Sequence, residues 1–134
     1  MTGQTIYKFT PDGTRSIFFG PEAFTNAETG AIGLAFDHFG NLFVSTVVFP
    51  YNSDRIIKFT PRDVKSTFAS GLPNPRGLVF DSAGKLFVAQ IPPSASGDIL
   101  RFTRHGVPTV FASAIGVPQE NGGPEYLAIQ PALP

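Results

Sequence analysis

The amino-acid sequence predicts an all-β protein built from repeated four-stranded antiparallel sheets. Three observations lead to this fold class. Short apolar segments recur along the chain at a nearly constant spacing, turn-forming residues separate them, and 14 glycines and 13 prolines leave no stretch for a long helix. A composition of 42% hydrophobic and 15% charged residues is typical of a folded domain.

The first recurring segment has the pattern apolar, variable, basic, phenylalanine, threonine. It occurs three times, at residues 6–10, 56–60 and 99–103. Another phenylalanine stands nine positions after that of each copy, at Phe18, Phe68 and Phe111. Such short segments are typical of β-strands. The Pro11-Asp12-Gly13 sequence between the first two apolar runs predicts that they form a hairpin.

The second recurring feature is a pair of segments joined by a tight turn. Gly-Leu-x-Phe-Asp occurs at residues 33–37 and 77–81 and, more loosely, at 126–130, and Gly-x-Leu-Phe-Val follows at 40–44 and 84–88. The aspartate can accept hydrogen bonds from the turn backbone, and the following glycine can adopt a positive φ. Four strands therefore recur in each repeat.

The repeat length favours a β-propeller. Successive copies begin 50 and 43 residues apart, at Ile6, Ile56 and Ile99, and only the connections differ in length. Four antiparallel strands in a repeat of this length describe a propeller blade. The strand at 33–37 is then innermost, and the strand that holds Phe18, Phe68 or Phe111 is outermost.

The repeat resembles those of the NHL-repeat and SMP-30-like propeller families, over nearly the whole chain. Residues 74–81, 84–88 and 99–102 carry the resemblance. The third copy departs from the pattern, because Tyr126 stands where glycine is expected and Gln130 where aspartate is expected, as in a terminal unit. The resemblance implies a propeller fold and does not specify one function.

The strand count predicts an incomplete ring. One partial propeller domain, residues 1–134, holds two outer strands in 1–19, full blades at 33–68 and 77–111, and one innermost strand at 126–130. Propellers usually have four to eight blades, so the chain is a half-propeller. Two chains would supply 22 of the roughly 24 strands of a six-bladed ring. We therefore expect a homodimer with shared junction blades; the alternatives are a fragment of a longer propeller and a different blade number.

Composition excludes several classes of partner and chemistry. Ten basic residues balance ten acidic ones, so no net charge attracts nucleic acid or an anionic membrane. Without cysteine there is no disulfide, thiolate zinc site or cysteine nucleophile. The longest uncharged apolar stretch, 42–50, is too short to cross a bilayer, and no signal-peptide pattern opens the sequence. We expect a soluble chain of unknown compartment.

Candidate binding residues follow from the predicted topology, which places the long connections on one face of the propeller. Arg76 and Glu125 directly precede innermost strands, so we expect them at the mouth of the central channel, where they bind a polar ligand or pair with each other. Asn74 and Asn121 lie on the same side. Tyr51 could stack on a glycan or peptide, or cap the neighbouring blade.

The same face carries oxygen donors that suit calcium better than zinc: Asn26, Asn74, Asn121, Glu22, Glu28 and Glu120. The SMP-30-like resemblance implies a lactone hydrolase with a divalent metal held in the channel by Glu, Asn and Asp. Asn74 and Asn121 do not occupy equivalent repeat positions, so we assign no metal site. His38 and His105 are expected far apart in short turns on the opposite face, and we assign no catalytic residue.

The first functional hypothesis is a non-enzymatic binding or scaffold module that self-associates and holds a small molecule, glycan or peptide on its long-loop face. The second is a metal-dependent lactone hydrolase of the SMP-30 or gluconolactonase kind, which would need clustered carboxylate and amide oxygens on the channel axis and tight binding of calcium or zinc; we assign no cofactor to the chain, with calcium as the possible exception. The third is a propeller fragment without an evolved activity.

Overall fold

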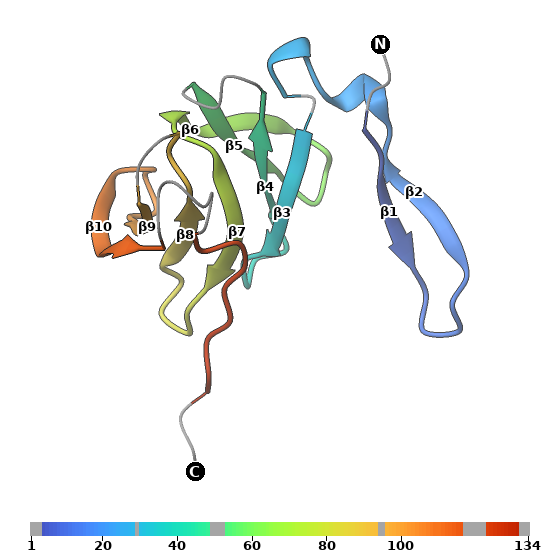
Figure 1. The fold of residues 1–134 in the computed structure, drawn as a ribbon. Coiled ribbons are helices and arrows are strands. Elements are labelled where there is room, and N and C mark those ends of the chain that lie inside the picture. Colours follow the sequence, from blue (N-terminus) through green and yellow to red (C-terminus); the bar gives the residue numbers. More distant parts are fainter. Residues whose placement is uncertain (1–3, 29, 49–52, 94–95, 117–122, 132–134) are drawn as a thin grey trace.

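The computed structural model describes residues 4–28, 30–48, 53–93, 96–116 and 123–131. It contains ten strands and two short 3-10 helices (Figure 1). They are β1 (Ile6–Phe9), β2 (Arg15–Phe19), η1 (Pro21–Ala23), η2 (Asn26–Glu28), β3 (Gly30–Phe36), β4 (Leu42–Val47), β5 (Asp54–Phe59), β6 (Lys65–Leu72), β7 (Pro75–Phe80), β8 (Leu86–Gln90), β9 (Gly97–Phe102) and β10 (Pro108–Ile115). No helix in these ranges is long and apolar enough to cross a membrane.

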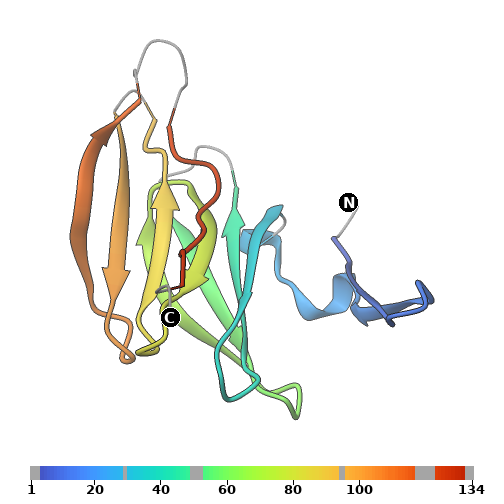
Figure 2. The same cartoon turned by 90° about the horizontal axis from the view of Figure 1, so that it is seen from below.

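The strands form three antiparallel sheets that follow the order of the chain. β1 pairs with β2 as a hairpin, β3 to β6 form the first four-stranded sheet, and β7 to β10 form the second. Figure 2 shows the hairpin and the two sheets succeeding one another across the molecule. This succession of four-stranded antiparallel sheets is that of propeller blades, which confirms the predicted fold class.

The turns form as their sequences predict. Asp37 Oδ1 accepts the N–H groups of Phe39 and Asn41, both at 2.9 Å, and Gly40 takes a φ of 86°. Asp81 repeats these contacts in the second sheet, with Gly84 at a φ of 83°. The short side chain of aspartate and the missing Cβ of glycine therefore fix these links.

Two apolar cores separate the three sheets. The first lies between the hairpin and the β3–β6 sheet and consists of Ile6, Phe19, Leu42, Val44, Ile57 and Phe59. The second lies between the two four-stranded sheets and consists of Phe43, Ile56, Leu72, Leu78, Leu86, Val88, Leu100 and Phe102. Alternate residues of a strand point to opposite faces, so the β3–β6 sheet contributes to both cores.

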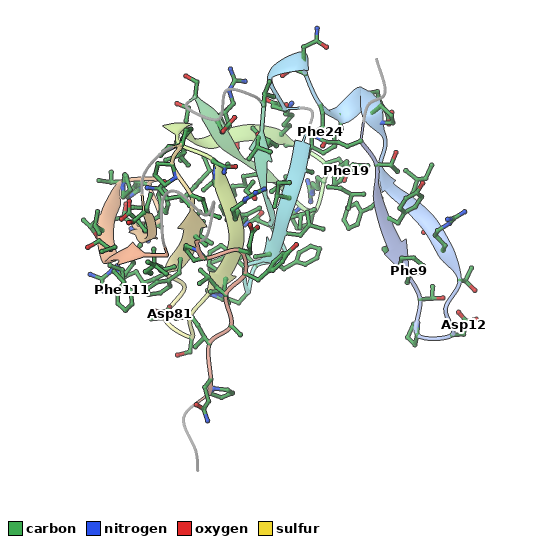
Figure 3. The ribbon with its side chains drawn as sticks, in the orientation of Figure 1. Phe9, Asp12, Phe19, Phe24, Asp81 and Phe111 are labelled. Atoms are coloured by element: carbon green, nitrogen blue, oxygen red, sulfur yellow. The ribbon has the colours of Figure 1, made fainter. Side chains whose placement is uncertain are left out.

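Phenylalanines at equivalent repeat positions carry the contacts between sheets. Phe59 stacks on Phe19, with ring centroids 4.2 Å apart, and meets Phe24 edge-on at 5.9 Å. Figure 3 shows Phe19 and Phe24 between the hairpin and the first four-stranded sheet. Phe102 contacts Phe68 at 5.8 Å in the second core. Phe59 and Phe102 thus share a repeat position, while their partners differ, because Phe68 corresponds to Phe18 and not to Phe19.

The eleventh strand predicted at 126–130 is not formed, since the described residues after β10 contain no strand. The segment still lies beside β7, where the N–H of Gly77 donates to the carbonyl oxygen of Glu125 at 2.8 Å. The physical reason is a missing neighbour. Among the described residues, no strand pairs with residues 126–130 on the side away from β7.

Candidate functional site

The structure brings Arg76 and Glu125 together. Arg76 Nε lies 3.3 Å from Glu125 Oε2, with 24% and 46% of the two side chains exposed. Both residues directly precede innermost positions, Gly77 in β7 and Tyr126 in the C-terminal segment. The pair is therefore a half-exposed ion pair that a polar ligand could contact through its outer atoms.

The backbone beneath this pair is tightly packed. Ser45 Oγ accepts the N–H of Gly33 at 2.8 Å and donates to the carbonyl of Arg76 at 2.6 Å. In the next blade Ala89 takes the place of Ser45, and Gly77 donates directly to Glu125. A Cβ on Gly33 would lie 2.4 Å from the Arg76 carbonyl oxygen, so only glycine fits there.

Asn74 acts as an internal tie between loops. Its side chain is 7% exposed and its φ is 53°. Its N–H donates to Asp54 Oδ2 at 3.2 Å, and its Nδ2 donates to the carbonyl of Ile91 at 2.9 Å. Asp54 Oδ1 also accepts the N–H of Val48 at 2.8 Å, and burial raises the pKa of this carboxyl. Asn74 is thus held below the surface on which a ligand would bind.

Two other sequence-predicted binding residues, Tyr51 and Asn121, lie outside the described residues, as does Glu120.

Glu28 is the centre of an ion-pair cluster that the sequence does not reveal. Its side chain is 2% exposed; Oε1 lies 3.1 Å from Arg55 Nη1, and Oε2 contacts Lys65 Nζ and the N–H of Thr25. Burial acts to raise the pKa of Glu28, but the hydrogen bonds and charge of Lys65, with the bonds from Thr25 and Arg55, outweigh it and lower the pKa. Both carboxylate oxygens of Glu28, which the sequence suggested as calcium donors, are therefore already paired within the protein.

No group of three or more His, Cys, Asp or Glu side chains is arranged to hold a metal ion within the part of the chain that the structure describes.

The expectation that His38 and His105 lie far apart is wrong. Both line one cavity of about 240 Å³ between the two four-stranded sheets, together with Lys58 and Arg104. His38 belongs to the β3–β4 turn and His105 to the β9–β10 turn, and neighbouring blades bring these two turns together. Asp37, the carboxylate in this cavity, already accepts its turn N–H groups.

Each end of the succession of sheets exposes an apolar face. The leading face belongs to the hairpin and consists of Tyr7, Phe9 and Ile17, which are 47%, 63% and 63% exposed. The trailing face is the outer side of the β7–β10 sheet, where Val79, Phe87, Ile99 and Phe111 line a cavity of about 360 Å³ together with Leu127 and Ile129 of the C-terminal segment. Figure 3 shows Phe9 and Phe111 at opposite ends of the molecule.

Neither a family model nor a curated protein matches the chain. A crystal structure of selenomethionine-substituted virginiamycin B lyase from Staphylococcus aureus is similar, with a TM-score of 0.54 and 18% sequence identity. The match covers 81% of this chain, which spans about a third, 34%, of that chain. At this identity the likeness supports the propeller fold alone. The NHL and SMP-30 resemblance is not confirmed at the level of family.

Proposed function

We propose that this chain is a non-enzymatic β-propeller binding module that completes its ring by association with a second copy. The observation that carries the proposal is the pair of apolar faces that remain exposed at the two ends of the described part of the chain. Aromatic side chains at the same repeat positions are buried inside the chain and exposed at its two ends: Phe59 is 2% exposed and Phe9 63%.

Leaving both apolar faces in water is energetically costly. Burying apolar surface yields about 25 cal/mol per Å², and an aromatic side chain offers roughly 150–250 Å². Contiguous exposed apolar patches of this kind mark interaction sites on folded proteins. A second copy satisfies both ends at once, since each chain carries one leading and one trailing face.

The proposed ligand surface is the long-loop face of the assembled ring. In a dimer with two-fold symmetry, the Arg76–Glu125 pair occurs twice around the channel mouth. Such a ring of alternating charges suits a polar small molecule, glycan or peptide, bound by the exposed atoms of Glu125, which is 46% exposed. No observation in the described ranges favours metal-dependent lactone hydrolysis over this role.

The solution mass tests the proposal. Light scattering coupled to size exclusion, over a tenfold range of concentration, is expected to give twice the mass of the chain. A folded monomer at every concentration contradicts association, and masses that grow without limit contradict ring closure. Circular dichroism of the same samples establishes that the chain is folded.

A further inference from the structure

We infer that the leading face of one copy docks on the trailing face of the other, so that Phe9 lies beside Phe111 of the second copy as Phe102 lies beside Phe68 within one chain. This inference rests on the proposed self-association and specifies its geometry. It excludes a like-with-like contact between two hairpins or between two β7–β10 sheets.

The leading face of the hairpin corresponds to two surfaces that are buried within the same chain. Tyr7 and Phe9 occupy the repeat positions of Ile57 and Phe59 in β5, and of Leu100 and Phe102 in β9. These four residues are between 0% and 6% exposed, because the preceding sheet covers them. Tyr7 and Ile17 are paired across the hairpin, so they share the face that lacks this cover.

The trailing face corresponds to the surface of the β3–β6 sheet that covers β9 within the chain. Phe87 and Phe111 correspond to Phe43 and Phe68. Both pairs meet edge-on with ring centroids 5.0 Å apart. Phe68 then contacts Phe102 of the next sheet at 5.8 Å, whereas Phe111 is 58% exposed. The exposed surface beside Phe111 therefore corresponds to the surface beside Phe68 that Phe102 covers.

The turns that flank these contacts also correspond to each other. Gly106, in the β9–β10 turn, has a φ of 81°, and a Cβ on it would lie 2.3 Å from the carbonyl oxygen of Phe68. Gly13 holds the same place in the hairpin turn with a φ of 89°, and nothing lies within 4 Å of its Cβ position. The hairpin turn can thus approach Phe111 of a second copy as closely as Gly106 approaches Phe68.

Because the two faces differ, a closed dimer contains two identical junctions, each between one leading and one trailing face. Two variants that carry opposite charges on the two faces should therefore associate with each other better than either associates with itself. A charge placed at Phe9 in one chain and an opposite charge at Phe111 in the other leaves one junction wild-type and creates an ion pair in the second. Each variant alone has an unpaired charge in both junctions.

The test uses Phe9→Glu, Phe111→Lys and an equimolar mixture of the two, measured by light scattering beside the wild type. Each variant alone is expected to dissociate, with a dimer constant weaker by on the order of a hundredfold or more, and the mixture is expected to recover the mass of two chains. Phe39→Glu is the matched control, because Phe39 is 72% exposed but lies in the β3–β4 turn, off both faces. Circular dichroism checks that each variant is folded.

The outcomes separate the two proposals. Dimers of Phe9→Glu or Phe111→Lys alone, with the stability of wild-type dimers, overturn the docking geometry and leave self-association intact. Dissociated variants that do not recover on mixing overturn the pairing of leading with trailing face. A wild-type chain that is monomeric throughout overturns the proposed function itself.

Discussion

Alanine substitution of equivalent phenylalanines should give very different losses of stability at three positions of one motif. Phe59 and Phe102 are 2% and 1% exposed, and each packs in a core between two sheets. Truncation of a buried phenylalanine removes its transfer free energy and leaves a cavity, which costs about 3–5 kcal/mol. Phe59→Ala and Phe102→Ala should lower the free energy of unfolding by this amount.

Phe9→Ala should behave differently because the ring is 63% exposed in the single chain. The unburied fraction of a side chain of about 200 Å² is roughly 125 Å², which is worth about 3 kcal/mol when a second copy covers it. The roughly 75 Å² that is already buried is worth about 2 kcal/mol, so the substitution should change the free energy of unfolding of the monomer by about 2 kcal/mol or less. Its main effect should be on the dimer, in both junctions.

Urea unfolding followed by circular dichroism, at two protein concentrations a hundredfold apart, measures both effects. The wild-type midpoint is expected to rise with concentration, and the Phe9→Ala midpoint is expected to stay nearly constant. At the low concentration Phe9→Ala should lose about 2 kcal/mol or less, which is less than the about 3–5 kcal/mol that Phe59→Ala and Phe102→Ala lose. An equal loss at Phe9 and Phe59 under dilute conditions would refute the assignment of Phe9 to an open face.

Two further predictions concern single side chains and a third concerns metal ions. The pKa of Glu28 lies below its usual 4.5, so its ion pairs stabilise the fold at neutral pH, and this contribution is lost as the pH falls below 4.5. The free energy of unfolding should therefore fall less steeply with acidification in Glu28→Gln than in the wild type. Parallel curves for the two proteins would contradict the role of the cluster. Ser45→Ala should lower the free energy of unfolding measured in urea by about 1–3 kcal/mol, because it leaves the Gly33 N–H and the Arg76 carbonyl without their partner, and an unchanged urea midpoint would contradict this role. Millimolar calcium, zinc or manganese should leave the thermal midpoint unchanged, and a rise would support the metal-dependent hydrolase instead.

Local chemistry made the blades predictable from the sequence. Asp37 and Gly40 form the turn that their spacing implies, and Phe59 and Phe102 pack at the recurring aromatic position. The turn depends on residues within one repeat, whereas Phe59 and Phe102 recur in sequence but pack against phenylalanines of the preceding sheet. The two classes of turn and the order of strands in each sheet could therefore be derived without knowledge of the tertiary structure.

Features that depend on contacts between repeats were not predictable. Glu28 meets Arg55 and Lys65, which lie 27 and 37 positions away and have no motif in common with it. The shared cavity of His38 and His105 arises because turns of two successive blades come together. The strand expected at 126–130 is absent because a strand needs a pairing partner as well as a suitable sequence.

A distance between spin labels tests most directly the claim that two copies close one ring. The chain has no cysteine, so Ser66→Cys, on the exposed outer strand β6, introduces a single labelling site. Pulsed electron paramagnetic resonance should give one narrow interlabel distance, because two-fold symmetry places the two β6 strands in a fixed relation. A broad distribution, or no dipolar signal at any concentration, would contradict the closed dimer.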